Sequence, residues 1–170
     1  IARQGKGLAR LHAVWGLGQL ARDGQNQDGA LVPLLSDADG EVQTQAAKIL
    51  GEAKSKAAVP GLIKLLGSDN ARAQAQAAIA LSKIGGNYTD AVVAMLRRND
   101  DSDPIVRHGG IMALQALGQA LPVAQLSRDK SVAVRLATLI ALRREGNPSV
   151  ATFLADAQPQ IVLEAARAIA

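Results

Sequence analysis

The chain has 170 residues, a length that suits one repeat array or one globular domain. Hydrophobic residues make up 48% of it and aromatic residues only 2%, so alanine, leucine, isoleucine and valine must build the core. The absence of cysteine excludes disulfides, thiolate metal sites, covalent haem attachment and a cysteine nucleophile. A net charge of +4 is a mild excess of positive charge. No run of about 18 apolar residues occurs, so the sequence predicts no membrane-spanning segment.

A hydrophobic pattern about thirty residues long recurs five times along the chain. Each copy opens with an apolar or small residue, followed by a small residue four positions later and leucine or isoleucine eight positions later. The opening residues are Val42, Ala73, Val106, Val134 and Ile161. Positions 0, 4 and 8 lie on one face of an α-helix, and a repeat of 20–50 residues is typical of stacked solenoids.

In chain order, a leading helix at 7–22 is followed by five pairs, each with a shorter helix A and a longer helix B. Helix A is expected at 29–36, 57–67, 89–98, 121–127 and 148–155, and helix B at 40–53, 70–85, 104–119, 131–145 and 159–170. Pro104, Pro148 and Pro159 suit a first helical turn. No alternating strand pattern occurs. The prediction is therefore all-α, an α-α superhelix of about 5.5 helix pairs.

The same periodicity predicts a single domain, with a partial repeat at 1–27. Full repeats are expected at 28–55, 56–87, 88–119, 120–146 and 147–170. The first residue is Ile1, and Ala170 falls inside a helical pattern with no capping glycine. We therefore expect this segment to come from a longer protein.

Three strings carry a family resemblance: LVPLLSDADGEVQTQAAKILG, LIKLLGSDNARAQAQAAIALSKIG and VAQLSRDKSVAVRLATLIALRREG. They resemble HEAT repeats, including the short phycobilisome-lyase-like variety. The resemblance implies a right-handed, armadillo-like helical solenoid. It also implies an aspartate in each turn paired with an arginine in helix B. Asp101/Arg107 and Asp129/Arg135 keep that pairing.

The other copies lack the arginine. Gln43, Gln74 and Val162 stand in its place, so a ladder of aspartate–arginine pairs is expected to be broken at both ends.

Four further strings are similar to a narrower group: ARLHAVWGLGQLAR, DPIVRHGGIMAL, SVAVRLATLIALRREG and PQIVLEAARAI. They resemble the HEAT region of large bacterial proteins described as membrane-bound dehydrogenases. There the array lies between a sugar-dehydrogenase-like propeller and a c-type cytochrome module. The resemblance implies a redox-related, extracytoplasmic parent protein. This chain holds neither a propeller nor a CxxCH motif, so no redox role passes to any of its residues.

A stacked helix B touches its own helix A and both neighbouring repeats, which leaves only a narrow strip free. The strip is predicted to be a partly apolar concave docking surface made by His12, Trp15, Lys48, Ile79, His108, Met112, Gln115, Ile140, Arg143 and Arg167. Ala75 and Leu136 fall on the same strip. The alternative is a register shifted by one residue, which would place these side chains in the core.

Residues with metal or catalytic potential have simpler interpretations. His108 and Met112 are four apart and could share a metal, but no carboxylate cluster completes a site. The aspartates before Pro104 lack the EF-hand pattern and suit a helix cap. The pair Gly85-Gly86 lacks the strand–loop–helix context of a phosphate cradle. We therefore predict no catalytic, metal or cofactor residue, and no enzyme activity for this segment.

Nucleic acid is the main rival partner. The arginines that could contact phosphates are Arg97, Arg98, Arg107, Arg128, Arg135 and Arg143. The small net charge and the scarcity of stacking aromatics argue against this. The favoured prediction is a non-catalytic scaffold for protein–protein or interdomain contacts within a larger, redox-related bacterial protein. A nucleic-acid-binding solenoid and a bilin or cofactor lyase-like module remain the alternatives.

Overall fold

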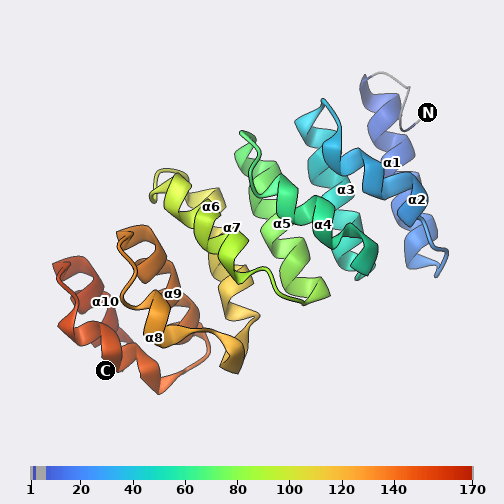
Figure 1. The fold of residues 1–170 in the computed structure, drawn as a ribbon. Helices are drawn as coiled ribbons and strands as arrows, with labels where there is room; N and C mark the ends of the chain where they lie inside the picture. Colours follow the sequence, from blue (N-terminus) through green and yellow to red (C-terminus); the bar gives the residue numbers. More distant parts are fainter. Residues whose placement is uncertain (1, 3–6, 170) are drawn as a thin grey trace. The chain divides into compact units, whose positions relative to one another are not determined.

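The computed structural model describes residues 2 and 7–169. Within these residues every regular element is a helix and no strand occurs. The chain divides into two compact units, Ile1–Tyr88 (unit 1) and Thr89–Ala170 (unit 2). Figure 1 shows that each unit is built from successive helical hairpins.

Unit 1 has two layers of helices. Its elements are α1 (Gly7–Arg22), α2 (Asp28–Leu31), the 3₁₀ helix η1 (Val32–Ser36), α3 (Gly40–Glu52), the 3₁₀ helix η2 (Lys56–Ala58), α4 (Val59–Leu65) and α5 (Ala71–Ile84). The long helices α1, α3 and α5 are the B helices, and α3 contacts both of the others. The short elements η1 and α4 form the second layer and pack on α3 and α5.

Unit 2 repeats this plan. Its elements are α6 (Thr89–Asn99), α7 (Pro104–Gln115), the 3₁₀ helix η3 (Gly118–Ala120), α8 (Val123–Leu126), α9 (Val132–Arg144), the 3₁₀ helix η4 (Pro148–Ala155) and α10 (Pro159–Ile169). Here α7, α9 and α10 are the B helices, and α9 contacts both of the others. The A elements α6, α8 and η4 pack against them.

Polar side chains start the B helices where the sequence offers them. Asn70 Oδ1 accepts a hydrogen bond from the Ala73 N–H at 2.9 Å, and Asp103 Oδ1 accepts one from the Ile105 N–H at 2.7 Å. Such caps satisfy backbone donors that have no partner inside the helix. The predicted B helices match α3, α5, α9 and α10 to within one residue at each end over the described residues.

Two differences from the predicted helices have local causes. The segment expected as one helix at 29–36 changes from α to 3₁₀ geometry, because Pro33 has no N–H to donate to the preceding turn. The helix expected at 104–119 ends at Gln115, and Gly118 then adopts a positive φ of 51°. A left-handed residue of this kind cannot continue an α-helix.

The predicted core positions are buried. Val42, Ala73, Val106, Val134 and Ile161 are each at most 2% exposed. Small residues bring neighbouring helices close together: a Cβ added to Gly51 would lie 2.7 Å from the Ala80 Cα. In unit 2, a Cβ added to Gly110 would lie 2.5 Å from the Leu96 side chain. Neighbouring helices can therefore approach closely because glycine stands at these contacts.

Four of the five turns between helix A and helix B are held by a side chain that bonds to the residue six positions before it. Gln43 Nε2 donates to the Asp37 carbonyl at 2.7 Å, and Gln74 donates in the same way to the Ser68 carbonyl. The glutamines thus take over the local bond that was expected to be missing. At Val162 the ladder of aspartate–arginine pairs is broken as expected, because the valine side chain has no hydrogen-bond donor.

In unit 2 the same position carries arginine. Arg107 Nη1 donates to Asp101 Oδ1 at 2.6 Å, and Arg135 Nη1 donates to the Asp129 carbonyl at 2.8 Å. Arg135 also reaches Asp156 in the next turn, with Nε 2.7 Å from its carboxylate. One guanidinium therefore closes its own turn and ties it to the following repeat.

Candidate functional site

The B surface of unit 1 is the outer side of α1, α3 and α5, and it carries an aromatic pair. The side chains of His12, Trp15 and Lys48 are exposed there and Ile79 is half-buried. Trp15 is 45% exposed, and its ring stacks on that of His12 with 5.1 Å between ring centroids. Its Nε1 donates to Gln45 Oε1 on α3 at 3.1 Å. The two helices are therefore joined by polar contacts at the surface.

The polar contacts continue from α3 to α5. Gln45 Nε2 donates to Glu41 Oε1 at 2.8 Å, and Arg72 of α5 lies 3.2 Å from Glu41. Ala75, which the sequence placed on the same strip, is buried and is not part of this surface. The B surface of unit 1 thus consists of a line of paired polar groups and one exposed aromatic pair, His12 and Trp15, on α1.

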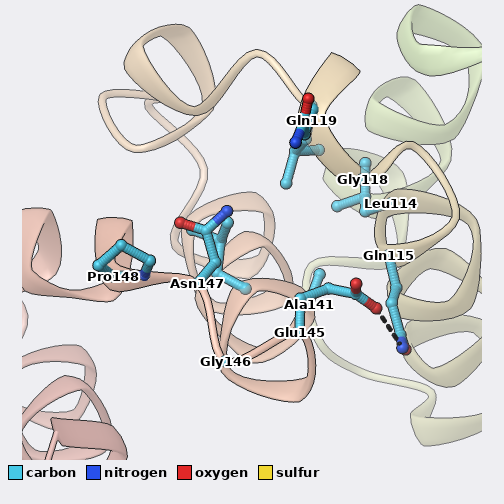
Figure 2. A pocket seen from close by; sticks show the side chains of 11 residues that line it. Leu114, Gln115, Gly118, Gln119, Ala141, Glu145, Gly146, Asn147 and Pro148 are labelled. Carbon is cyan, nitrogen blue, oxygen red and sulfur yellow. Dashed lines mark hydrogen bonds between the residues drawn. The ribbon is translucent and has the colours of Figure 1, made fainter.

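The B surface of unit 2 is the outer side of α7, α9 and α10. Its predicted members are exposed or half-buried: His108, Met112, Gln115, Ile140, Arg143 and Arg167. Leu136 is buried instead, because it lies in the core of α9. Gln115 Nε2 donates to Glu145 Oε1 at 2.7 Å, a contact drawn in Figure 2. Arg144 Nη1 lies 3.5 Å from the Met112 sulfur.

Ion pairs and exposed apolar side chains share this surface. Arg143 and Arg167 both pair with Glu164 of α10, at 2.9 and 3.1 Å. Ile105 on α7 and Leu163 on α10 are each 50% exposed. Ile105 was not predicted from the sequence, because it directly precedes an opening core residue and so gives no periodic signal.

Two turn aspartates in unit 2 are held in their ionised form. Burial opposes ionisation of Asp129 and of Asp156. Asp129 accepts hydrogen bonds from Arg97 and from the Ser131 N–H, and Asp156 accepts them from Arg135 and from the Gln158 N–H. These bonds and the arginine charges outweigh the effect of burial, so the pKa of both carboxyl groups is lowered. The bond to Asp129 in turn raises the pKa of Arg97. These groups hold the turns in place, and Asp129 and Arg97 also line an open surface pocket.

Each unit also contains a cavity at the C-terminal ends of two successive B helices, which the sequence analysis did not predict. The cavity of unit 2 has a volume of about 300 Å³ and lies at the ends of α7 and α9 (Figure 2). It is lined by Leu114, Gln115, Gly118, Gln119, Leu121, Ala141, Leu142, Glu145, Gly146, Asn147 and Pro148. Glu145 is its only charged side chain.

The cavity of unit 1 has a volume of about 390 Å³ and lies at the ends of α1 and α3. It is lined by Ala21, Gly24, Gln25, Asn26, Gln27, Asp28, Leu31, Leu50, Ala53, Lys54, Ser55 and Lys56. Its walls carry two cations and one carboxylate, and most of its other side chains are polar.

Other kinds of site find no support in the described part of the chain. Residues 7–169 hold no group of three histidine, aspartate or glutamate side chains placed to share a metal ion. His108 and Met112 lie on the same helix, α7, without a third ligand. None of the helices in this range combines the length and the apolar character needed to cross a bilayer.

Comparison with known proteins gives a family and a fold. Residues 29–115, just over half of the chain, match the family described as HEAT repeats. No curated protein matches the chain in sequence. The crystal structure of an engineered protein is similar, with 21% identity and a TM-score of 0.59 over 98% of this chain and 91% of the other. A designed armadillo repeat protein, solved in complex with the peptide (KR)4, has 20% identity and a TM-score of 0.58 over 99% of this chain and 95% of the other.

At such identities the likeness concerns the fold alone. Both the family match and the two structures are repeat solenoids, and they confirm the predicted fold class, an all-α α-α superhelix.

Proposed function

Since this chain belongs to the family of HEAT repeats, we propose that it is a non-catalytic scaffold that binds a protein partner or a neighbouring domain on its B surfaces. Folds of this kind present long surfaces, and their functions reside in particular sites on them. The partner is expected to be a folded protein or an extended peptide rather than a small molecule.

The observation that carries the proposal is the composition of the B surface of unit 2. Ile105 and Leu163 are each half-exposed to solvent, and Met112 and Ile140 are partly exposed, beside the arginines that pair with Glu164. Protein interfaces combine apolar anchors and arginine with a polar rim. Exposed apolar side chains that gather on one face are typical of interaction sites.

A second line of support comes from the solved relatives. The designed armadillo repeat protein was solved with the peptide (KR)4, so a solenoid of this fold can hold a peptide.

The nucleic-acid alternative is weakened by ion pairing. Arg97, Arg107, Arg135 and Arg143 each pair with a carboxylate of the same unit. A guanidinium that is already paired must lose that partner before it binds a phosphate. Strong duplex binding that falls steeply as salt rises would reverse this ranking.

We propose further that the parent protein is bacterial, extracytoplasmic and related to membrane-bound dehydrogenases. The support is the similarity of the four short strings in α1, α7, α9 and α10 to the HEAT region of that group. The complete gene should then encode a propeller and a CxxCH motif beside this array. For the lyase-like alternative, the test is a spectral shift on adding a tetrapyrrole, and no shift would argue against it.

Site-specific crosslinking tests the scaffold proposal. A photoreactive benzoylphenylalanine at position 112 or 140, in the host cell, should crosslink to one common protein. The same group at position 154 is the matched control, because Leu154 is an exposed apolar residue on η4, an A element. Ile140→Asp should abolish the adduct at position 112 while circular dichroism stays unchanged. Equal adducts from position 154, or none from 112 and 140, would reject the proposal.

A further inference from the structure

Two helices in unit 1 and one in unit 2 end in the same hydrogen-bonded turn, which makes their cavities comparable residue by residue. After α3, the Lys54 N–H donates to the Gly51 carbonyl and the Ser55 N–H to the Leu50 carbonyl. The same two bonds follow α1, from Gly24 and Gln25, and α9, from Gly146 and Asn147. This is the Schellman motif, in which the first of the two donors takes a left-handed conformation.

Lys54 is the exception among these three positions. Gly24 and Gly146 have φ values of 83° and 60°, and Lys54 has a φ of 52°. Glycine adopts this conformation without steric cost, whereas a residue with a Cβ is strained in it. Strained residues of this kind are concentrated at binding sites, where the side chain is needed for another reason.

The side chains around Lys54 point to the chemistry of a ligand. Ser55 is 7% exposed, lines the cavity, and its hydroxyl has no hydrogen-bond partner in the described residues. Lys54 and Lys56 lie on either side of it in sequence, are exposed, and make no ion pair with a described residue. The Ser55 hydroxyl oxygen is itself buried and is not open to the cavity, so the two free lysine cations are the groups that suit a carboxylate.

The remaining wall favours a peptide over a free anion. Gln25, Asn26 and Gln27 contribute side-chain amides, and Asp28 contributes an acceptor. A peptide offers backbone N–H groups for Asp28 and C=O groups for the amides, whereas inorganic phosphate is mainly a hydrogen-bond acceptor and has little to offer Asp28. The cavity of about 390 Å³ is also larger than one carboxylate needs.

The equivalent cavity of unit 2 shows that these features are specific to unit 1. Gly146, Asn147 and Pro148 stand where unit 1 has Lys54, Ser55 and Lys56, and the lining there contains no lysine or arginine. The Asn147 side-chain oxygen has a partner, because it accepts a hydrogen bond from the Ser149 N–H.

We propose that the cavity of unit 1 binds an acidic peptide segment of a partner protein, with Lys54 and Lys56 holding its carboxylates. This site lies at the ends of the B helices and is separate from the B surfaces.

Fluorescence anisotropy of the whole 170-residue chain with fluorescein-labelled hexaglutamate tests the proposal. Binding should saturate and should weaken as salt rises. Lys54→Gly and Lys56→Ala should each weaken it about fivefold, and the double variant more than tenfold. Lys64→Ala, an exposed lysine on α4, is the matched control and should bind like the unaltered chain.

Thermal unfolding separates binding from folding. Lys54→Gly should raise Tm by about 2 °C, because glycine fits the left-handed turn, so weaker binding cannot result from unfolding. The proposal is overturned by no saturation at millimolar peptide, by equal loss in Lys64→Ala, or by unchanged binding in the double variant. Inorganic phosphate that displaces the peptide at the same concentration would identify a site for small anions and reject the peptide.

Discussion

The α3–α5 junction of unit 1 and the α9–α10 junction of unit 2 join successive repeats by different means. In unit 1, Gly51 brings α3 against the Ala80 backbone of α5, and Gln43 closes its own turn only. In unit 2, Arg135 closes its own turn and also pairs with Asp156 of the next repeat. An amide can hold one turn, whereas a guanidinium has enough donors to couple two. The guanidinium of Arg135 therefore couples two repeats, whereas at the α3–α5 junction the equivalent Gln43 does not, and the repeats are joined there by close packing and by the Arg72–Glu41 ion pair.

The largest expected effect is the loss of the charge link. Arg135→Ala leaves the buried Asp156 carboxylate without its cation, so the free energy of unfolding should fall by about 3 kcal/mol. Arg143→Ala, which breaks the exposed pair with Glu164, should cost less than about 1 kcal/mol. Urea denaturation of both variants measures the difference. Equal losses would show that burial of the pair does not matter.

Close packing in unit 1 is tested by a single methyl group. In Gly51→Ala the new Cβ meets the Ala80 backbone, which cannot move aside, so we expect a loss of about 2 kcal/mol. Gly110→Ala in unit 2 meets only the Leu96 side chain, which can change rotamer, and the better helix propensity of alanine offsets part of the cost. Its loss should be under about 1 kcal/mol by the same denaturation measurement. A larger loss of stability in Gly110→Ala than in Gly51→Ala would contradict the role of close packing in unit 1.

The glutamine bond of unit 1 should make a smaller, charge-independent contribution. Gln43→Ala removes one hydrogen bond to the Asp37 carbonyl and should cost about 1 kcal/mol. Since no charge is involved, the loss should be the same at low and high salt. A loss that shrinks in high salt would indicate an electrostatic role that the geometry does not show.

The smallest expected effect is the loss of stability at low pH. Because the pKa of Asp129 and of Asp156 is lower in the folded chain, their ionised forms stabilise it fully above the unfolded value of about 3.9. That stabilisation disappears as the pH falls through the lower folded pKa. Hydrogen exchange in α9 and α10 should therefore accelerate as the pH drops below about 4, beyond the intrinsic effect of pH. Asp129→Asn should flatten this response and cost less than about 1 kcal/mol at neutral pH.

Much of this architecture could be predicted from residue periodicity. The opening residues such as Val42 and Val134 are buried as expected, because a stripe that recurs every 3.6 residues can only face the core of a stacked pair. The end of α7 was missed by four residues, since Gln115 to Gln119 continues a helical composition. Only the backbone shows that Gly118 has already left the helix.

The candidate sites were less accessible to sequence reasoning. The periodic strip correctly leaves Met112 and Ile140 at least partly exposed, but it included Leu136, which lies in the core. Whether the strip binds a partner stays a prediction. The cavity of unit 1 could not be foreseen, because Lys54 is informative only once its left-handed conformation is known. The role of Gln43 was missed because family patterns lead one to look for arginine at that position.

The scarcity of aromatic residues makes the chain easy to follow by spectroscopy. Trp15 is the only tryptophan, it is partly exposed, and it rests on His12 while bonding to Gln45 of the next helix. Its emission therefore comes from one place, the contact between α1 and α3. A partner that settles on the B surface of unit 1 would change that emission directly, without any added label.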